Sequence, residues 1–116
     1  MSQHHSINYL EIPVKDLIAT KAFFTQVFGW QFQDYGPQYS CFLQVGIDGG
    51  FYQADSQFTL ENGSPLIVLY SQDLAATEAK IIQAGGLITK AVFSFPGGRR
   101  FHFSDVNGNE YAVWSE

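Results

Sequence analysis

The stretch DLIATKAFFTQVFG at residues 16–29 recurs as DLAATEAKIIQAGG at residues 73–86, with seven identities in fourteen ungapped positions. A repeat of this kind indicates a duplicated structural unit, and two copies are too few for a solenoid. The sequence therefore predicts two similar half-domains related by a pseudo-twofold axis, with a site where the halves meet.

Both copies of the repeat have the pattern of an amphipathic helix. Asp16 and Asp73 are suited to the N-cap position, and Gly29 and the pair at 85–86 are suited to ending a helix. Apolar residues recur at helical spacing between these ends. The residues predicted to be buried are Leu17, Thr20, Phe24, Val27 and Phe28 in the first helix, and Leu74, Thr77, Ile81 and Ala84 in the second.

Segments with the alternation of strands surround both helices. In the first half they are residues 7–14, 30–35, 39–45 and 51–54, with a turn at 48–50. In the second half they are residues 66–70, a strand opening at 87, 99–104 and 111–114. The order predicts an α+β fold with an N-terminal βαβββ module at 6–54, a linker at 55–64 and a C-terminal βαβββ module at 65–116. We expect the sheets to curl into a partly open, eight-stranded, barrel-like sheet around a cavity, with the helices outside.

Composition limits the classes of function. The chain has 116 residues, 46% of them hydrophobic, which indicates one globular domain. Its net charge of −5 argues against nucleic acid and anionic membrane surfaces as partners. Cys41 is the single cysteine and cannot form an internal disulfide. With no apolar run of about 18 residues and no signal-peptide pattern, we expect a cytoplasmic protein outside the membrane.

Three motifs carry a resemblance to a known family. They are IPVKDL at 12–17, FF at 23–24 followed by VFGW at 27–30, and FSDVNGNEY at 103–111. Together with the duplicated βαβββ order they resemble the vicinal-oxygen-chelate superfamily, which includes glyoxalase I, extradiol dioxygenases, and bleomycin-resistance and fosfomycin-resistance proteins. The resemblance covers nearly the whole chain, and it implies the fold more specifically than the function.

The resemblance also implies four positions for the ligands of a divalent ion, which in the metal-dependent members are His, Glu or Gln side chains. Three of these positions hold Tyr9, Leu66 and Ala112, and the fourth falls near Gly50 and Phe51. A divalent ion needs about three or four converging ligands. We therefore predict no metal site of the family type and no cofactor.

Strand alternation selects the residues that face the predicted cavity. For residues 99–104 two alternatives remain open, with either Arg100 and His102 or Phe101 and Phe103 facing inward. The first is favoured because phenylalanines suit the face packed on the helices. The predicted ligand-binding residues are Tyr9, Glu11, Phe42, Phe51, Tyr70, Arg100, His102, Glu110 and Trp114.

These residues predict a metal-independent protein that binds a small organic molecule between the sheets. Aromatic rings beside carboxylates favour a cationic or aromatic ligand, and the resemblance implies a homodimer. The alternative is a glyoxalase-like lyase or isomerase, or a dioxygenase-like enzyme with an atypical metal set, in which Glu11, His102 and Glu110 are the candidate catalytic acids and bases. An interaction module whose cavity is filled by its own side chains is a third possibility.

Overall fold

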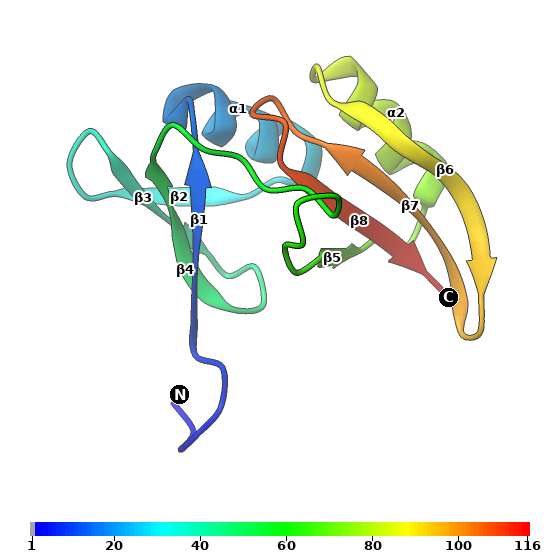
Figure 1. Cartoon of the computed structure of the whole chain (residues 1–116), viewed down its shortest axis with the longest axis horizontal. Helices are drawn as coiled ribbons and strands as arrows, with labels where there is room; N and C mark the ends of the chain where they lie inside the picture. Colours follow the sequence, from blue (N-terminus) through cyan, green and yellow to red (C-terminus); the bar gives the residue numbers. More distant parts are fainter. Residues whose placement is uncertain (1) are drawn as a thin grey trace.

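A computed structural model describes residues 2–116 and contains two helices and eight strands (Figure 1). The elements of the first half are β1 (Tyr9–Val14), α1 (Leu17–Phe28), β2 (Gln31–Asp34), β3 (Tyr39–Leu43) and β4 (Asp48–Gln53). Those of the second half are β5 (Ile67–Tyr70), α2 (Leu74–Gln83), β6 (Leu87–Phe95), β7 (Gly98–Ser104) and β8 (Glu110–Ser115). The α+β class and the duplicated βαβββ order are confirmed.

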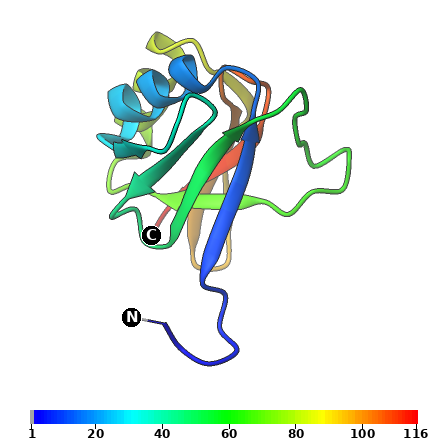
Figure 2. The same cartoon turned by 90° about the vertical axis from the view of Figure 1, so that its left-hand side faces the viewer.

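Each half forms its own four-stranded mixed sheet. The strand orders are β1-β4-β3-β2 and β5-β8-β7-β6, and β1 and β5 each run parallel to their neighbour. The sheets lie on opposite sides of the molecule with both helices at the top (Figure 1), and the view from the left shows β1, β4 and β3 side by side (Figure 2). The sheets stay separate and do not close into a barrel. The edge strands of the two sheets therefore do not pair with each other within one chain.

The predicted N-caps and the end of α1 are confirmed, whereas α2 ends at Gln83 with Ala84 as its C-cap, just before the predicted glycines. Asp16 and Asp73 are the N-caps, and their carboxylates accept hydrogen bonds from the backbone N–H groups of Ala19 and Ala76. Gly29 ends α1 in the left-handed conformation, at φ 72°, which a residue without a Cβ adopts at no cost. An N-cap of this kind contributes about 1 kcal/mol to the stability of its helix.

Helix α1 packs against both sheets at once, which joins the modules into one core. The Phe24 ring lies 5.3 Å from that of Phe51 in β4 and 5.4 Å from that of Tyr111 in β8. Phe23, which the helical spacing did not select, stacks on Phe103 of β7 and is 2% exposed. The predicted stripe of α1 is therefore too narrow, because a helix between two sheets buries two flanks rather than one.

The loop between β3 and β4 differs from the prediction. Asp48 to Gly50 were expected to form a turn, but they are the first residues of β4. The chain turns earlier, where Gln44 and Gly46 have φ values of 57° and 108°.

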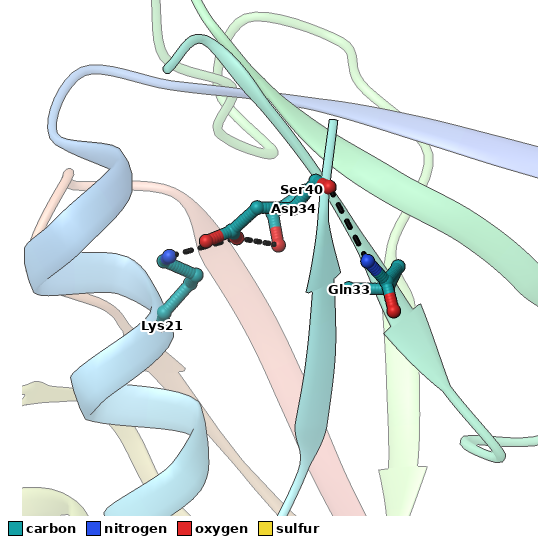
Figure 3. Close-up of polar contacts among 4 residues, drawn as sticks. All are labelled: Lys21, Gln33, Asp34 and Ser40. Carbon is teal, nitrogen blue, oxygen red and sulfur yellow. Dashed lines mark hydrogen bonds and ion pairs between the residues drawn. The ribbon is translucent and has the colours of Figure 1, made fainter. Parts of the chain in front are cut away.

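An ion pair holds the outer strand of the first sheet to α1. Lys21 Nζ lies 2.8 Å from Asp34 Oδ1, and Ser40 Oγ donates to the same oxygen at 2.7 Å (Figure 3). The Gln33 amide donates to the backbone carbonyl of Asp34. Lys21, followed by Ser40, lowers the pKa of the Asp34 carboxyl.

Among the described residues no helix has the length and apolarity that a membrane crossing requires.

Candidate functional site

The first sheet has one face on the core and one open face. In β1, Ile12 and Val14 are buried in the core, whereas Tyr9 and Glu11 lie on the open face, as alternation predicts. We call the exposed side of β1 to β4 the first open face.

A chain of hydrogen bonds crosses the first open face. Tyr39 Oη donates to Glu11 Oε2 at 2.9 Å, and the hydroxyls of Tyr9 and Tyr39 are 2.6 Å apart. Tyr39 is in β3 and its two partners are in β1, so its ring must pass over β4. It passes over Gly50, where an added Cβ would lie 2.8 Å from two ring carbons of Tyr39. The missing side chain at Gly50 therefore makes the contact between β3 and β1 possible.

The direction of each hydrogen bond in this chain follows from proton counting. The Glu11 carboxylate can only accept, so the single proton of Tyr39 is donated to it. Tyr9 must then donate to Tyr39, which leaves the Tyr9 oxygen as an acceptor. The thiol of Cys41 lies 3.5 Å from that oxygen and is its donor. The chain thus runs from Cys41 through Tyr9 and Tyr39 to Glu11.

Both tyrosines of the chain remain phenols over a wide pH range. Burial, followed by the hydrogen bonds with Tyr9 and Glu11, raises the pKa of Tyr39 well above its usual value of 10.0. The hydrogen bond with Cys41 is the main cause that raises the pKa of Tyr9. The first open face therefore presents neutral hydroxyls backed by a carboxylate.

A shallow pocket of about 370 Å³ lies beside Tyr9 and Cys41. Asp48 contributes a carboxylate to it, and none of the strands β1 to β4 contains a Lys or Arg. Its lining residues are Tyr9, Gln33, Tyr35, Cys41, Phe42, Leu43, Asp48 and Gly49. The first open face is therefore acidic and aromatic, which suits a hydrogen-bond donor or an organic cation.

The second sheet also has an open face, formed by β5 to β8. Phe101 and Phe103 of β7 are completely buried in the core, so Arg100 and His102 lie on the open face. The favoured alternative for residues 99–104 is confirmed. In β8, Tyr111 is likewise in the core.

Cations and rings alternate on the second open face. The Arg100 guanidinium lies 5.2 Å from the ring centre of Phe93 and 5.5 Å from that of Phe95, and Lys90 Nζ lies 4.4 Å from the Phe93 ring. Trp114 packs edge-on against Tyr70, at 5.2 Å between ring centres. This face is basic and aromatic, in contrast to the first open face.

His102 is buried within this basic face, at 4% exposure. Its Nε2 and the Nε of Arg100 are buried, and neither has a hydrogen-bond partner within residues 2–116. Burial, followed by the charges of Arg100 and Lys90, lowers the pKa of His102 below 6.5, against the opposite effect of Glu110. The imidazole is therefore neutral at neutral pH, and no described residue engages its Nε2.

The predicted site residues thus separate into two groups. Tyr9 and Glu11 lie together on the first open face, and the second open face holds Tyr70, Arg100, His102, Glu110 and Trp114. Glu110 is engaged at the edge of this group, since its Oε1 accepts from the backbone N–H of Leu60. Within one chain no strand of one sheet pairs with a strand of the other.

Phe42 and Phe51 are not on an open face. They are 4% and 0% exposed and pack in the core with Trp30, because their strand positions alternate with those of Cys41 and Gly50. Tyr39 is the residue that the sequence reasoning missed. Tyr39 stands two residues before Cys41 and so lies on the same face, and Cys41 pairs with Gly50; this spacing is the signal that could have found it.

The residues at the metal-ligand positions of the metal-dependent relatives do not fit a metal ion. Tyr9 is engaged with Tyr39, while Leu66, Ala112 and Gly50 have no side-chain donor atom. Residues 2–116 contain no group of three or more His, Cys, Asp or Glu side chains placed to hold an ion.

Comparison with known proteins agrees with the fold. The chain superposes on a glyoxalase-related enzyme from Fulvimarina pelagi with a TM-score of 0.80 at 16% identity, covering 97% of this chain and 88% of that one. The fosfomycin resistance protein FosX of Listeria monocytogenes superposes with a TM-score of 0.79 at 18% identity, covering 98% of this chain and 95% of that one. A glyoxalase/bleomycin resistance protein/dioxygenase family enzyme of Burkholderia phytofirmans superposes with a TM-score of 0.76 at 19% identity, covering 93% of this chain and 96% of that one.

No curated protein matches the sequence. The sequence pattern of the Glyoxalase/Bleomycin resistance protein/Dioxygenase superfamily, however, matches residues 6–113. This match covers both modules with their helices and sheets. The chain therefore belongs to the glyoxalase/bleomycin resistance protein/dioxygenase superfamily.

Proposed function

We propose that this protein binds a small organic molecule on its open sheet faces without the help of a metal ion. The observation that carries the proposal is the set of side chains on these faces, where aromatic rings stand beside charged and hydroxyl groups. Among residues 2–116, side chains able to ligate a metal do not converge. Recognition of an organic ligand needs an apolar surface with a few placed polar groups, and no reactive centre.

The chemistry of the first open face favours a ligand with a cationic or donor group attached to an aromatic or apolar body. The Tyr9 oxygen accepts, and the carboxylates of Glu11 and Asp48 lie on the same face. A cation there would meet negative charge and the faces of tyrosine rings, both of which are favourable. No basic side chain of β1 to β4 competes for these carboxylates.

We further propose that the protein acts as a homodimer in which the ligand lies between sheets of two copies. The two open faces of one chain belong to separate sheets, and they carry opposite charge, with Glu11 and Asp48 on the first and Lys90 and Arg100 on the second. A second copy can place its basic face over the acidic face of the first. Complementary charge would set the orientation of such a pair.

A lyase or isomerase reaction is the second candidate function. The observation that favours it is the neutral imidazole of His102, which could accept a proton, on the same open face as Glu110. Glu11, the remaining candidate acid or base, lies on the other sheet, so a second copy would have to bring it near His102.

Binding of paired probes tests the main proposal. We would measure the affinity of phenethylamine and of phenylacetate by isothermal titration calorimetry, because the two share a ring and differ in the sign of their charge. The amine should bind more tightly, and Glu11→Gln should weaken it while Glu61→Gln, in the exposed linker, should not. Equal affinity of both probes for all variants contradicts the proposed ligand class.

Metal content and turnover separate the two candidate functions. The protein is purified without added metal, its metal content is measured by mass spectrometry, and it is assayed with a hemithioacetal. Binding proteins should show neither stoichiometric metal nor turnover. Stoichiometric Zn, Ni, Fe or Mn together with turnover would contradict the proposal of metal-independent binding.

A further inference from the structure

A cavity of about 460 Å³ lies between the modules, lined by residues of both, and it reaches the second open face at Tyr70. Its first wall comes from the first module, from β1, β3, the end of α1 and the loop before β4. Its second wall is the whole of β5, and Tyr111 of β8 also lines it. The lining residues are Leu10, Ile12, Phe28, Trp30, Phe42, Val45, Ile47, Ile67, Val68, Leu69, Tyr70 and Tyr111. We call this the junction cavity.

The junction cavity has no charged side chain in its lining. Its floor is the core itself, since Ile12, Phe42 and Tyr111 are each at most 4% exposed. Its rim consists of partly buried apolar residues, among them Val45 and Ile47. A cavity of this size with apolar walls falls in the range of small-molecule sites, whose volumes are about 300–1,000 Å³.

Polar groups of the backbone accompany these apolar walls. β1 and β5 are both edge strands, with β4 and β8 as their single neighbours in the sheets. An edge strand presents peptide N–H and C=O groups that its sheet does not use. The Tyr70 hydroxyl donates its proton to Glu116, so its oxygen remains only as an acceptor. The hydrogen-bonding groups offered to a ligand are therefore neutral: peptide groups and the Tyr70 oxygen.

We propose that the junction cavity is a second binding site, for an uncharged small molecule that has an apolar body and at least one hydrogen-bonding group. A charged ligand would lose its hydration there without gaining an opposite charge, whereas a neutral amide or amine can pair with peptide groups. The site is distinct from the open faces because its ligand differs from theirs in charge, although it shares Tyr70 with the second open face.

A pair of matched probes tests the charge preference. N-phenyl-1-naphthylamine is neutral and has one N–H donor, and 8-anilinonaphthalene-1-sulfonate adds a sulfonate to the same ring system. The neutral probe should bind with one-to-one stoichiometry and at least tenfold more tightly than the sulfonate. Absence of saturable binding, or tighter binding of the sulfonate, would overturn the proposal.

The two tryptophans of the chain locate the bound probe. Trp30 lines the junction cavity, whereas Trp114 lies on the second open face. In a Trp114→Phe protein the remaining emission comes from Trp30, and the neutral probe should quench it as it binds. Probe fluorescence that rises without quenching of Trp30 places the probe elsewhere and overturns the proposal.

Variants that fill the cavity provide the decisive comparison. Ile47→Phe and, independently, Val45→Phe should each lower the affinity for the neutral probe at least tenfold. Val92→Phe adds the same ring at an exposed position of β6 and should change nothing. Circular dichroism confirms folding of each variant, and unchanged affinity in a folded Ile47→Phe or Val45→Phe protein overturns the proposal.

Sedimentation equilibrium tests whether a second copy of the chain, rather than a small molecule, occupies the junction cavity. If Ile47→Asp dissociates a dimer, the cavity is an interface between copies and the proposed ligand site is wrong. If it abolishes probe binding and leaves the association state unchanged, the ligand site is supported. Because these readouts do not involve Glu11, Arg100 or His102, they distinguish failure of this proposal from failure of open-face binding.

Discussion

Asn107 Oδ1 lies 3.1 Å from the backbone nitrogen of Asp16 and accepts its N–H, although 91 residues separate the two in the sequence. The same oxygen accepts from the N–H of Lys15 at 3.0 Å, and the Asn107 amide donates to Thr20 and to Asp105. The side chain is 5% exposed. A turn of the second module therefore holds the start of the first module's helix, which makes the two repeats one folding unit.

Replacement of Asn107 by Ala should destabilise the protein by about 2–4 kcal/mol, because it leaves the partly buried N–H groups of Lys15 and Asp16 without their acceptor and the buried Thr20 hydroxyl and Asp105 carboxylate without the amide donor. Urea unfolding followed by circular dichroism measures the change. Asn62→Ala, at an exposed position of the linker, serves as the control and should cost little. A loss no larger than that of the control would show that the turn does not hold α1.

The two helices and their ends could be predicted from the sequence because their signals are local. An aspartate accepts from the N–H three residues later, and a glycine ends α1 in a conformation that other residues avoid. Alternation also placed Tyr9, Glu11, Arg100 and His102 on the correct faces. These local patterns do not predict that both modules share a core around α1.

The errors have a common physical cause in long-range packing. The glycines at 49 and 50 have the composition of a turn, yet they stand in β4 because the Phe42 and Tyr39 rings occupy the space of their missing side chains. The same contacts place Phe42 and Phe51 in the core. Which ring fills the space above a glycine depends on a neighbouring strand, and single-sequence patterns do not contain that information.

Replacement of Glu11 by Gln should lower the pKa of Tyr39, since the carboxylate's hydrogen bond and charge help to raise it. In the wild type the Tyr39 hydroxyl should stay protonated at pH values where an ordinary tyrosine, with a pKa of 10.0, ionises. The measurement is the ¹³Cζ shift of labelled tyrosines during a pH titration, with Tyr39→Phe to assign the signal. Identical titration of Tyr39 in both proteins argues against the hydrogen-bond chain.

The proposed dimer predicts a reciprocal effect of charge reversal on the two open faces. Glu11→Arg and Arg100→Glu should each weaken association by about tenfold or more, because each places like charges opposite one another. The double variant should recover most of the wild-type association, which sedimentation equilibrium measures. Arg99→Glu changes the same charge at the neighbouring exposed position of β7 and should have a smaller effect. Additive losses in the double variant contradict pairing of the two faces.

His102 predicts the direction in which stability changes below neutral pH. Its pKa is lower in the folded protein than its usual value of 6.5, so the unfolded chain binds a proton more readily. The contribution of His102 to stability is therefore complete above about pH 6.5 and is lost as the pH falls through that value toward the folded-state pKa. Urea midpoints measured between neutral and acidic pH should decline in the wild type and decline less in His102→Gln. His4→Gln and His5→Gln alter exposed residues and should leave the profile unchanged.

Gly50→Ala tests whether the missing side chain in β4 permits Tyr39 to reach β1 across the first open face. A Cβ there would lie 2.8 Å from the Tyr39 ring and 2.8 Å from the Ser40 carbonyl oxygen, so the ring has to move and β3 with it. We expect a loss of stability of about 1–3 kcal/mol, as for other overpacked positions, together with a fall in the Tyr39 pKa as its contact with Glu11 is lost. Tyr39→Ala in the same protein removes the ring but not the backbone contact, and should recover part of the stability. If Gly50→Ala is as stable as the wild type and Tyr39 titrates as before, the ring does not depend on the glycine, and the contact between β3 and β1 must have another cause.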